Sequence, residues 1–301
     1  MKDKQKQAKK EQKTLVYHVT KPSELLPFLL SAMSSRSRNS VKSILTRGQV
    51  TVDDHVETKH NYPLRSGQTV TILKNKAAVK ESVFIGMSIL YEDKDMIVIN
   101  KDAGLLSIAT EKEKQRTAHY QLMDYVRQEN PQNRIFVVHR LDKDTSGVMM
   151  FAKSEKVKRE LQTNWKHNVK ERIYVALVEG KVKQPKGTVT SWLKESRTHL
   201  VYSSQHKKDG QLAVTHYNVI KAGNDFSLME VQLETGRKNQ IRVHMQDLGH
   251  PVVGDKKYGS TVNAIGRLGL HAKVLAFTHP MTGKVLRFEA DVPKSFWQKV
   301  R

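Results

Sequence analysis

One short segment brings together residue types that acid–base or nucleophilic chemistry uses. Apolar residues flank a polar turn that reads HRLDKDTSG from position 139 to 147. In an extended chain alternate side chains share a face, so Arg140 and Asp142 point the same way. A carboxylate two residues from a guanidinium is well placed to stay ionised, the state in which it acts as a base or a nucleophile. A plain hairpin turn fits the composition equally well, because Asp, Thr, Ser and Gly are common turn residues.

Two other kinds of site are excluded by residues in or near this segment. Asp142, Asp144 and Ser146 fit the first half of a calcium-binding loop, but the twelfth position is Lys153, where a bidentate carboxylate is required. A kinase catalytic loop reads HRD rather than HRLD, and no glycine-rich phosphate loop precedes this one. The chain also contains neither a P-loop nor a dinucleotide-binding fingerprint.

Thiol and zinc chemistry are not expected either. The chain has no cysteine, which excludes disulfides, thiol catalysis and Cys-ligated zinc. The spacing of the remaining candidate ligands matches no usual metal cluster; these are His139, His244, His271 and His279. We therefore expect no metal site.

The charge of the chain indicates a polyanionic partner. The 301 residues include 52 Lys and Arg against 30 Asp and Glu, a formal net charge of +22. Neutralising phosphates releases condensed counterions, so nucleic acid is the leading partner. A generally basic surface is the alternative, and membrane-surface binding has less support because no basic amphipathic helix with aromatic anchors occurs.

No apolar stretch approaches the roughly 20 residues that cross a bilayer, and the start of the chain lacks the apolar centre of a secretory signal. We expect a cytoplasmic protein.

The elements that position these residues fall into two domains. We expect a basic disordered tail at 1–13, a small domain at 14–76, a linker at 77–88 and a larger domain at 89–301. In the small domain, hydrophobic spacing predicts helices at 25–30 and 38–47, the second ending at Gly48, and strands at 49–52 and 68–73. A basic side is expected on the second helix, although a solvated helix face is the alternative; its residues are Arg36, Arg38, Lys42 and Arg47.

The larger domain is dominated by strands that run mostly in adjacent pairs, which indicates an α+β domain with a mixed sheet. Strands are predicted at 96–99, 135–141, 148–151, 173–178, 214–220, 227–233 and 285–290. Helices are predicted at 117–128, 154–165 and 239–248.

Two resemblances extend this interpretation. The sequence SRSRNSVKSILTRGQVTVDD, residues 35–54, resembles the S-four RNA-binding domain over roughly 20–75, which implies that the basic helix docks on folded RNA. The segment HRLDKDTSGVMMFAK, residues 139–153, resembles the signature of RluA-type pseudouridine synthases. Further segments that resemble this family follow in order: IYVALVEG from 173, AVTHY from 213, ETGRKNQIRVHM from 234, GHPVVGD from 249, LHA from 270 and HPMTG from 279.

Two segments depart from the family pattern. Residues 101–104 read KDAG where the family usually has Lys-Pro-x-Gly, and residues 236–240 read GRKNQ where GRTHQ is common. Neither change falls on Asp142 or on Arg242, the residues to which the resemblance gives catalytic roles. The two changes therefore bear on the subfamily and the target RNA rather than on the reaction.

The resemblance implies isomerisation of uridine to pseudouridine in RNA, without a metal or organic cofactor. Asp142 would be the essential carboxylate, which either attacks the anomeric carbon or helps to remove a ribose proton. Arg242 would be its ion-pair partner, with a surface phosphate contact as the alternative. Tyr174 would pack on the uracil ring and assist removal of the proton at carbon 5; the alternative is a half-buried sheet tyrosine.

The same resemblance assigns RNA contacts. Arg140 would fill the space that a flipped uridine vacates, unless it forms a structural salt bridge to Asp144. Arg237 would contact RNA. The fold implied is a mixed, mainly antiparallel sheet flanked by helices and loops, acting as a monomer on structured RNA. Large-subunit ribosomal RNA is favoured and transfer RNA is second. A non-catalytic RNA-binding or ribosome-assembly factor and a uridine N-glycosidase are the rival functions.

Overall fold

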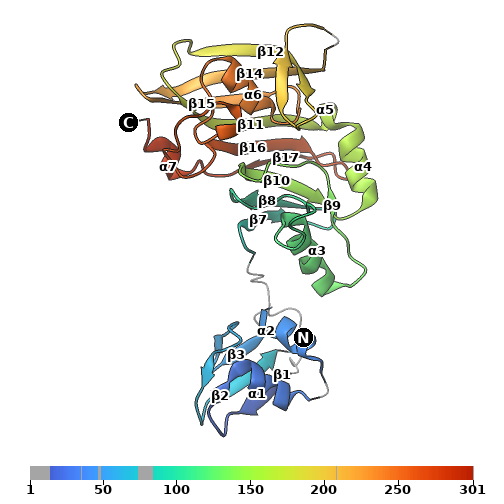
Figure 1. The fold of residues 1–301 in the computed structure, drawn as a ribbon. Coiled ribbons are helices and arrows are strands. Elements are labelled where there is room, and N and C mark those ends of the chain that lie inside the picture. Colours follow the sequence, from blue (N-terminus) through green and yellow to red (C-terminus); the bar gives the residue numbers. More distant parts are fainter. Residues whose placement is uncertain (1–13, 35, 47–48, 74–83, 208, 301) are drawn as a thin grey trace, which may run out of the picture. The chain divides into compact units, whose positions relative to one another are not determined.

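The computed structural model describes residues 14–34, 36–46, 49–73, 84–207 and 209–300. The chain divides into two compact units, residues 1–83 and 84–301, each of which is described by itself (Figure 1). The expected tail at 1–13, Arg47, Gly48 and residues 77–83 of the expected linker lie outside the described residues. No helix in the described part of the chain is both long and apolar enough to cross a membrane.

The smaller unit combines two helices with a four-stranded antiparallel sheet in the order β1-β6-β3-β4, and β2 pairs with β5. Its elements are β1 (Thr14–His18), β2 (Ser23–Glu24), α1 (Leu25–Ala32), α2 (Arg38–Thr46), β3 (Val50–Val52), β4 (His55–Val56), β5 (Pro63–Leu64) and β6 (Thr69–Leu73). Val41, Ile44 and Leu45 recur at helical spacing in α2 and are buried in the core of this unit. The helical pattern read from the sequence therefore marks the face that packs inward.

The larger unit is built on one sheet in the order β13-β12-β14-β15-β11-β16-β10-β8-β7, with β17 beside β16 and β9 beside β10. The strands are β7 (Met87–Glu92), β8 (Met96–Lys101), β9 (Phe136–Val137), β10 (Ser146–Ala152), β11 (Val169–Glu179), β12 (Lys186–Glu195), β13 (Val201–Ser204), β14 (Gln211–Ala222), β15 (Phe226–Leu233), β16 (Leu270–Thr278) and β17 (Val285–Glu289). The helices are α3 (Ala118–Glu129), α4 (Glu155–Thr163), α5 (Trp165–Asn168), α6 (Gln240–Asp247) and α7 (Lys294–Trp297). Every strand pair is antiparallel except β10 with β16, which confirms the α+β class with a mixed, mainly antiparallel sheet.

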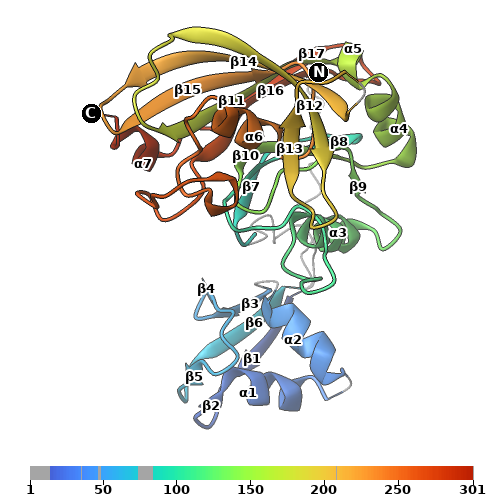
Figure 2. The same cartoon turned by 45° about the horizontal axis from the view of Figure 1, so that its top comes forward.

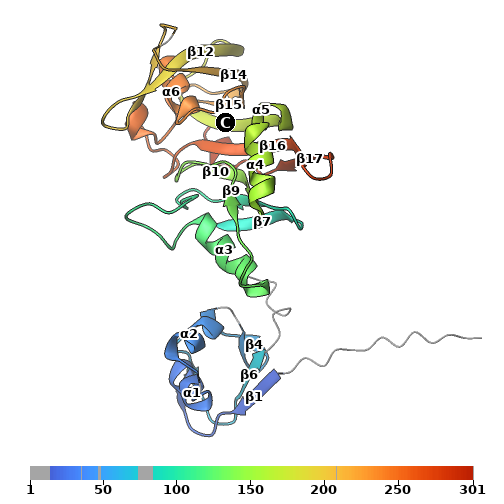
Figure 3. The same cartoon turned by 90° about the vertical axis from the view of Figure 1, so that its right-hand side faces the viewer.

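Helices cover both faces of this sheet. Met149 and Phe151 of β10 pack with α3, whereas Val148 and Met150 pack with α4, so alternate side chains of one strand enter two cores. The core of α6 shares Tyr174 with that of α3, which places both helices on the same face (Figure 3). Helices α4 and α5 lie at one end of the long strands and α7 lies at the other (Figure 2).

Three sequence predictions need correction. The strand expected at 135–141 is limited to β9, because the backbone N–H and carbonyl of Leu141 bond to the Ser107 hydroxyl, at 3.2 and 2.6 Å, instead of to a neighbouring strand. The helix expected at 154–165 is two helices, α4 and α5, which meet at Asn164. The long strands β12 and β16 were not predicted. Residues 138–145 thus form a loop at the sheet surface rather than a strand and a tight turn.

Candidate active site

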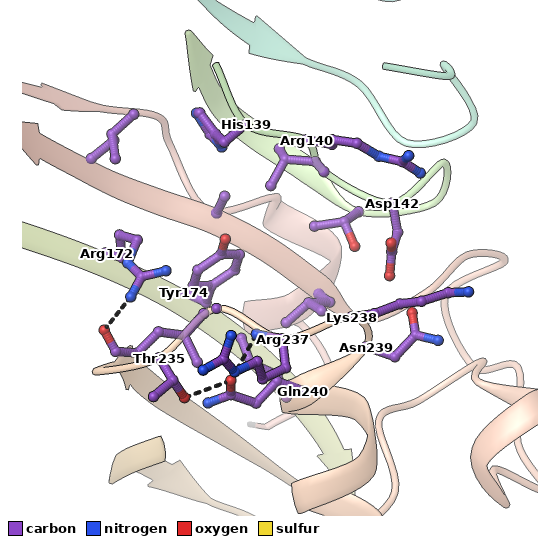
Figure 4. Close-up of a pocket in the computed structure, with 18 of the residues that line it drawn as sticks. His139, Arg140, Asp142, Arg172, Tyr174, Thr235, Arg237, Lys238, Asn239 and Gln240 are labelled. Atoms are coloured by element: carbon purple, nitrogen blue, oxygen red, sulfur yellow. Dashed lines mark hydrogen bonds between the residues drawn. The ribbon is translucent and has the colours of Figure 1, made fainter. Parts of the chain in front are cut away.

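A cleft of about 680 Å³ lies against β11 and β16 (Figure 4). Its other walls are the loop at 138–145, which precedes β10, residues 233–242 between β15 and α6, and Gln162, Trp165 and Lys166 from α4 and α5. This volume falls within the usual range of ligand sites, about 300–1,000 Å³. Of the predicted site residues, the cleft brings together Arg140, Asp142, Tyr174, Arg237 and Arg242.

The strand that follows the loop approaches its neighbour closely at Gly147. This residue has a φ of +113°, and a Cβ there would lie 2.1 Å from the carbonyl oxygen of Ala272, so only glycine fits. The hydroxyl of Ser146 accepts a hydrogen bond from Arg267 Nη2 and donates to His271 Nδ1, both at 2.7 Å. These contacts fix the end of the loop on β16.

A buried lysine holds the loop at 138–145 in place. Lys101 is fully buried, and its ammonium donates to three main-chain carbonyls at 2.7–3.0 Å, one of which belongs to Lys143, next to Asp142. Burial lowers the pKa of Lys101 to about 8, although the nearby carboxylate of Asp144 favours the charged form. The KDAG segment therefore keeps a structural contact to the loop despite its departure from the family pattern.

Arg242 projects from α6 and contacts two carboxylates in different ways. Its Nη1 lies 3.4 Å from Asp142 Oδ2, whereas Nε and Nη2 donate to both oxygens of Asp255 at 2.6 and 2.7 Å. Nη1 also donates to Asn239 Oδ1 at 3.1 Å, and the guanidinium lies 4.8 Å from the ring centre of Tyr258. Burial disfavours the charge, but the hydrogen bonds and charge of Asp255 outweigh it and raise the pKa of Arg242. The arginine is thus a fixed cation beside Asp142, with a side chain that is 15% exposed.

The two carboxylates differ in exposure. The Asp142 side chain is 38% exposed, whereas that of Asp255 is 1% exposed. Arg242 contacts Asp142, its predicted partner, but its bidentate and buried partner is Asp255. Its only sequence signal was its place in the GHPVVGD segment, because its contact to Arg242 depends on how the chain turns after α6.

Tyr174 lies on β11 in the middle of the cleft, between Asp142 and Arg172 (Figure 4). The pairing of β11 with β16 shifts register between Ile173 and Tyr174, and such a bulge re-aims a side chain. Burial raises the pKa of the Tyr174 hydroxyl; Arg172 lowers it and Asp142 raises it further. The hydroxyl is therefore protonated at neutral pH and the ring offers one side to the cleft.

The neighbours of Asp142 in the loop point in different directions. The Arg140 side chain is exposed at the rim and forms no ion pair with Asp144 or any other described residue. His139 packs on Trp165, with ring centres 5.3 Å apart, and its Nε2 accepts the N–H of Met150 at 3.2 Å. Burial lowers the pKa of His139 to about 4, so this histidine is neutral.

A buried amide orders the loop that carries Arg237. Gln240 is 2% exposed; its Oε1 accepts from the Thr235 hydroxyl at 2.8 Å and from the N–H of Arg237 at 3.0 Å. Its Nε2 donates to Val214 and Thr215 on β14, both at 2.9 Å. The Arg237 side chain is exposed and donates to a main-chain carbonyl at 3.0 Å. Sequence reasoning did not single out Gln240, although it lies in the quoted GRKNQ segment.

The other predicted RNA contacts belong to the smaller unit. Arg36 and Arg38 are exposed there and Lys42 is half-buried. Arg47 lies outside the described residues.

One group in the described residues could offer metal ligands. Atoms of Asp93, Asp95 and His279 lie within 4.8 Å of one another. However, His279 Nδ1 accepts the N–H groups of Met281 and Thr282, so its Nε2 carries the proton and donates to Asp93 at 3.0 Å. This arrangement fixes a turn and leaves the histidine no lone pair for a metal.

Comparison with known proteins identifies the family. A model of the RNA pseudouridylate synthase family matches residues 95–247, a segment that contains Asp142, Tyr174 and Arg242. The RNA pseudouridine synthase YlyB of Bacillus subtilis (strain 168), whose name marks it as uncharacterized, is 36% identical over 277 residues, which is 89% of each chain. The chain belongs to the RNA pseudouridylate synthase family.

Two further relatives agree. Ribosomal large subunit pseudouridine synthase D of Vibrio vulnificus (strain CMCP6) is 34% identical, covering 85% of this chain and 83% of that protein. The structure of human RNA pseudouridylate synthase domain containing 1 superposes with a TM-score of 0.55 and 26% identity, covering 68% of this chain and 83% of that one. The RluA-type assignment is confirmed. The protein is an RNA pseudouridine synthase, an isomerase, which disfavours both the non-catalytic and the glycosidase readings.

Proposed function

We propose that this pseudouridine synthase isomerises specific uridines of large-subunit ribosomal RNA, with Asp142 as the catalytic carboxylate and the target uridine flipped into the cleft. The observation that carries the proposal is the geometry around Arg242. Asp255 holds this guanidinium by two hydrogen bonds, so the cation stays 3.4 Å from Asp142 without covering its exposed oxygens. An ionised, accessible carboxylate is what the reaction requires.

Asp142 acts in one of two ways, and both use the ionised form. In the first, a carboxylate oxygen bonds to the anomeric carbon of ribose as the bond to nitrogen 1 of uracil breaks. The uracil rotates in the cleft, carbon 5 bonds to the anomeric carbon, and the carboxylate leaves. In the second, the carboxylate accepts a ribose proton as uracil departs and returns it after carbon 5 has bonded. Each route ends with loss of the proton at carbon 5 to solvent, while nitrogen 1 takes up a proton.

Tyr174 and Arg140 serve the uracil and the RNA respectively. The tyrosine ring packs on uracil while the ring turns, and its protonated hydroxyl lies within the same cleft. Extruding a base costs a few kcal/mol. Arg140 is exposed at the rim and unpaired within the described residues, so its planar guanidinium is available to fill the vacated space and to stack there.

The choice of ribosomal RNA rests on charge and on one relative's name. The formal net charge of +22 suits a large folded RNA, and the relative from Vibrio vulnificus is named for the ribosomal large subunit. We assign the smaller unit to the S-four type, because Arg36, just before α2, and Arg38, its first residue, are exposed in a unit that also holds a small antiparallel sheet. We propose that the protein acts as a monomer in the cytoplasm, where its RNA is.

Tritium release tests this function. Large-subunit ribosomal RNA and transfer RNA are transcribed with uridine labelled at carbon 5 and incubated with the protein. We expect tritium release from the ribosomal RNA only, and mapping of pseudouridines in cells with and without the protein then names the position. Release from transfer RNA alone would overturn the target, and release from neither would overturn the function.

A further inference from the structure

The cleft continues past Tyr174 on the side away from Asp142. Figure 4 shows Tyr174 between Asp142 and Arg172, which lies two residues earlier on β11. We call this far end the outer subsite; it is lined by Gln162, Trp165, Lys166 and Arg172. The target uridine, Asp142 and Tyr174 occupy the Asp142 end of the cleft in the proposed mechanism. That mechanism uses none of the four side chains of the outer subsite.

Arg172 is a half-buried cation that is held in place by neutral groups. Its Nη2 donates to the main-chain carbonyls of Leu233 and Glu234 at 3.2 and 3.1 Å. It forms no ion pair with any described carboxylate, because Glu234 turns its own side chain to His216 at 3.3 Å. Gly236 makes room for it: a Cβ there would lie 2.5 Å from Arg172 Nη1. A positioned guanidinium without a counter-ion fits an anionic oxygen, above all a phosphate.

The other side chains of the outer subsite suit a nucleotide. Trp165 is partly exposed; its ring lies against the neutral His139 and 6.0 Å from the Arg172 guanidinium carbon. Aromatic side chains beside cations bind bases of single-stranded nucleic acid with little sequence preference. Gln162 is tied to the Val138 carbonyl at 2.9 Å, and Lys166 is exposed on α5. One aromatic ring, one amide and two cations therefore line the same end of the cleft.

We propose that the outer subsite binds a nucleotide adjacent to the target uridine, with its base against Trp165 and its phosphate on Arg172 and Lys166. This inference rests on the proposed function, which gives the Asp142 end to the target itself. A neighbour held there fixes the distance between two successive nucleotides, so the strand must be unstacked at two positions. The subsite would thus select single-stranded or loop uridines over those in a continuous helix.

Abasic substitution tests the proposal. The probe is a synthetic RNA hairpin that carries the mapped uridine, with an abasic nucleotide on its 5′ side, on its 3′ side or on neither. For the wild-type protein we expect kcat/KM to fall about tenfold for one of the two abasic hairpins, the effect of losing one stacked base. For Trp165→Leu we expect less than about a twofold difference between that hairpin and the intact one.

Lys166 gives a second variant that folding cannot confound, because its side chain is exposed. Lys166→Ala should raise KM severalfold at unchanged kcat, while the matched control Lys156→Ala, also exposed but outside the cleft, should change neither. The proposal is overturned if neither abasic hairpin loses rate, or if the loss is equal in wild type and Trp165→Leu. Failure of the wild type to convert the intact hairpin would instead remove the proposed function, and this proposal with it.

Discussion

The two sides of the 138–145 loop use charge in opposite ways. We call the side that holds Asp255 and Lys101 the sealed side, because both side chains are buried there. The Asp255 carboxylate accepts two hydrogen bonds from Arg242, and the Lys101 ammonium donates three to main-chain carbonyls. On the cleft side, Asp142 and Arg140 are more exposed and have few partners in the described residues.

This difference separates stability from chemistry. A buried charge is tolerable only when it is paired, so removal of one partner is costly to the fold. An exposed charge contributes little to stability and stays available to a substrate. We therefore expect sealed-side variants to lose stability and cleft-side variants to lose activity, and the predictions below can break or sharpen this division.

Asp255→Asn should have the largest effect on the fold. The change removes the buried, bidentate counter-ion of Arg242 and leaves only the more exposed Asp142 at 3.4 Å, and the loss of a buried partner costs about 3–5 kcal/mol of unfolding free energy. Urea unfolding measures it, with the exposed Asp225→Asn as the matched control. A loss below about 1 kcal/mol in Asp255→Asn would show that this pair does not hold the site.

Lys101 should make stability rise with pH. The unfolded lysine keeps its proton up to about 10.5, whereas the folded one loses it near 8, so between these values the unfolded state binds more protons. Stability should increase by up to about 3 kcal/mol across this window. Measuring the unfolding free energy of wild type and Lys101→Met from about pH 7 to 10 isolates the contribution of this lysine, because the variant cannot titrate at this position. Equal pH slopes in both proteins would refute the assignment.

Arg140→Ala should slow the reaction without loosening the fold. Loss of a guanidinium that stacks and donates in the vacated space should lower kcat/KM about tenfold, the size of one lost charge-assisted hydrogen bond. A fluorescent base analogue at the target position should brighten on binding to wild type and less so with the variant. Arg134→Ala, exposed and outside the cleft, is the control. Identical fluorescence and rates would count against the role of Arg140 in flipping.

Arg36→Ala and Arg38→Ala should produce the smallest changes. If these two residues at the start of α2 contact phosphates, each substitution should reduce the slope of log affinity against log salt by about 1 and leave kcat unchanged. Filter binding to the ribosomal RNA across a salt series measures this, with Arg65→Ala as an exposed control in the same unit. An unaltered salt slope would remove these two residues from the interface.

Local patterns predicted the elements whose cause is local. Helix α3 begins after Thr117, whose hydroxyl accepts the N–H of Tyr120 and so caps the helix. Helix α6 follows the apolar spacing of Ile241 and Met245. Strand β16 escaped prediction because it is buried on both faces and shows no polar alternation. Residues 138–141 were predicted as the end of a strand, since nothing local reveals that the Ser107 hydroxyl replaces a strand partner of Leu141.

The site shows the same division. Asp142, Arg140, Tyr174 and Arg242 could be named from the sequence because they lie in segments that resemble a family. Asp255 and Lys101 also lie in quoted segments, but their contacts could not be predicted, because these contacts depend on how the chain folds back on itself. Arg242 and Asp255 are 13 residues apart, and Lys101 reaches a carbonyl 42 residues away. Sequence reasoning thus found the cleft side and missed the sealed side.

The most direct test of this account is single-turnover tritium release by Asp142→Asn, together with its unfolding free energy and RNA affinity. We predict that release falls by about 10⁴-fold, as for other essential carboxylates. Stability and affinity should stay close to those of the wild type, because this side chain is exposed and makes one long contact. Turnover within tenfold of wild type, or a loss of stability like that of Asp255→Asn, would contradict the central claim.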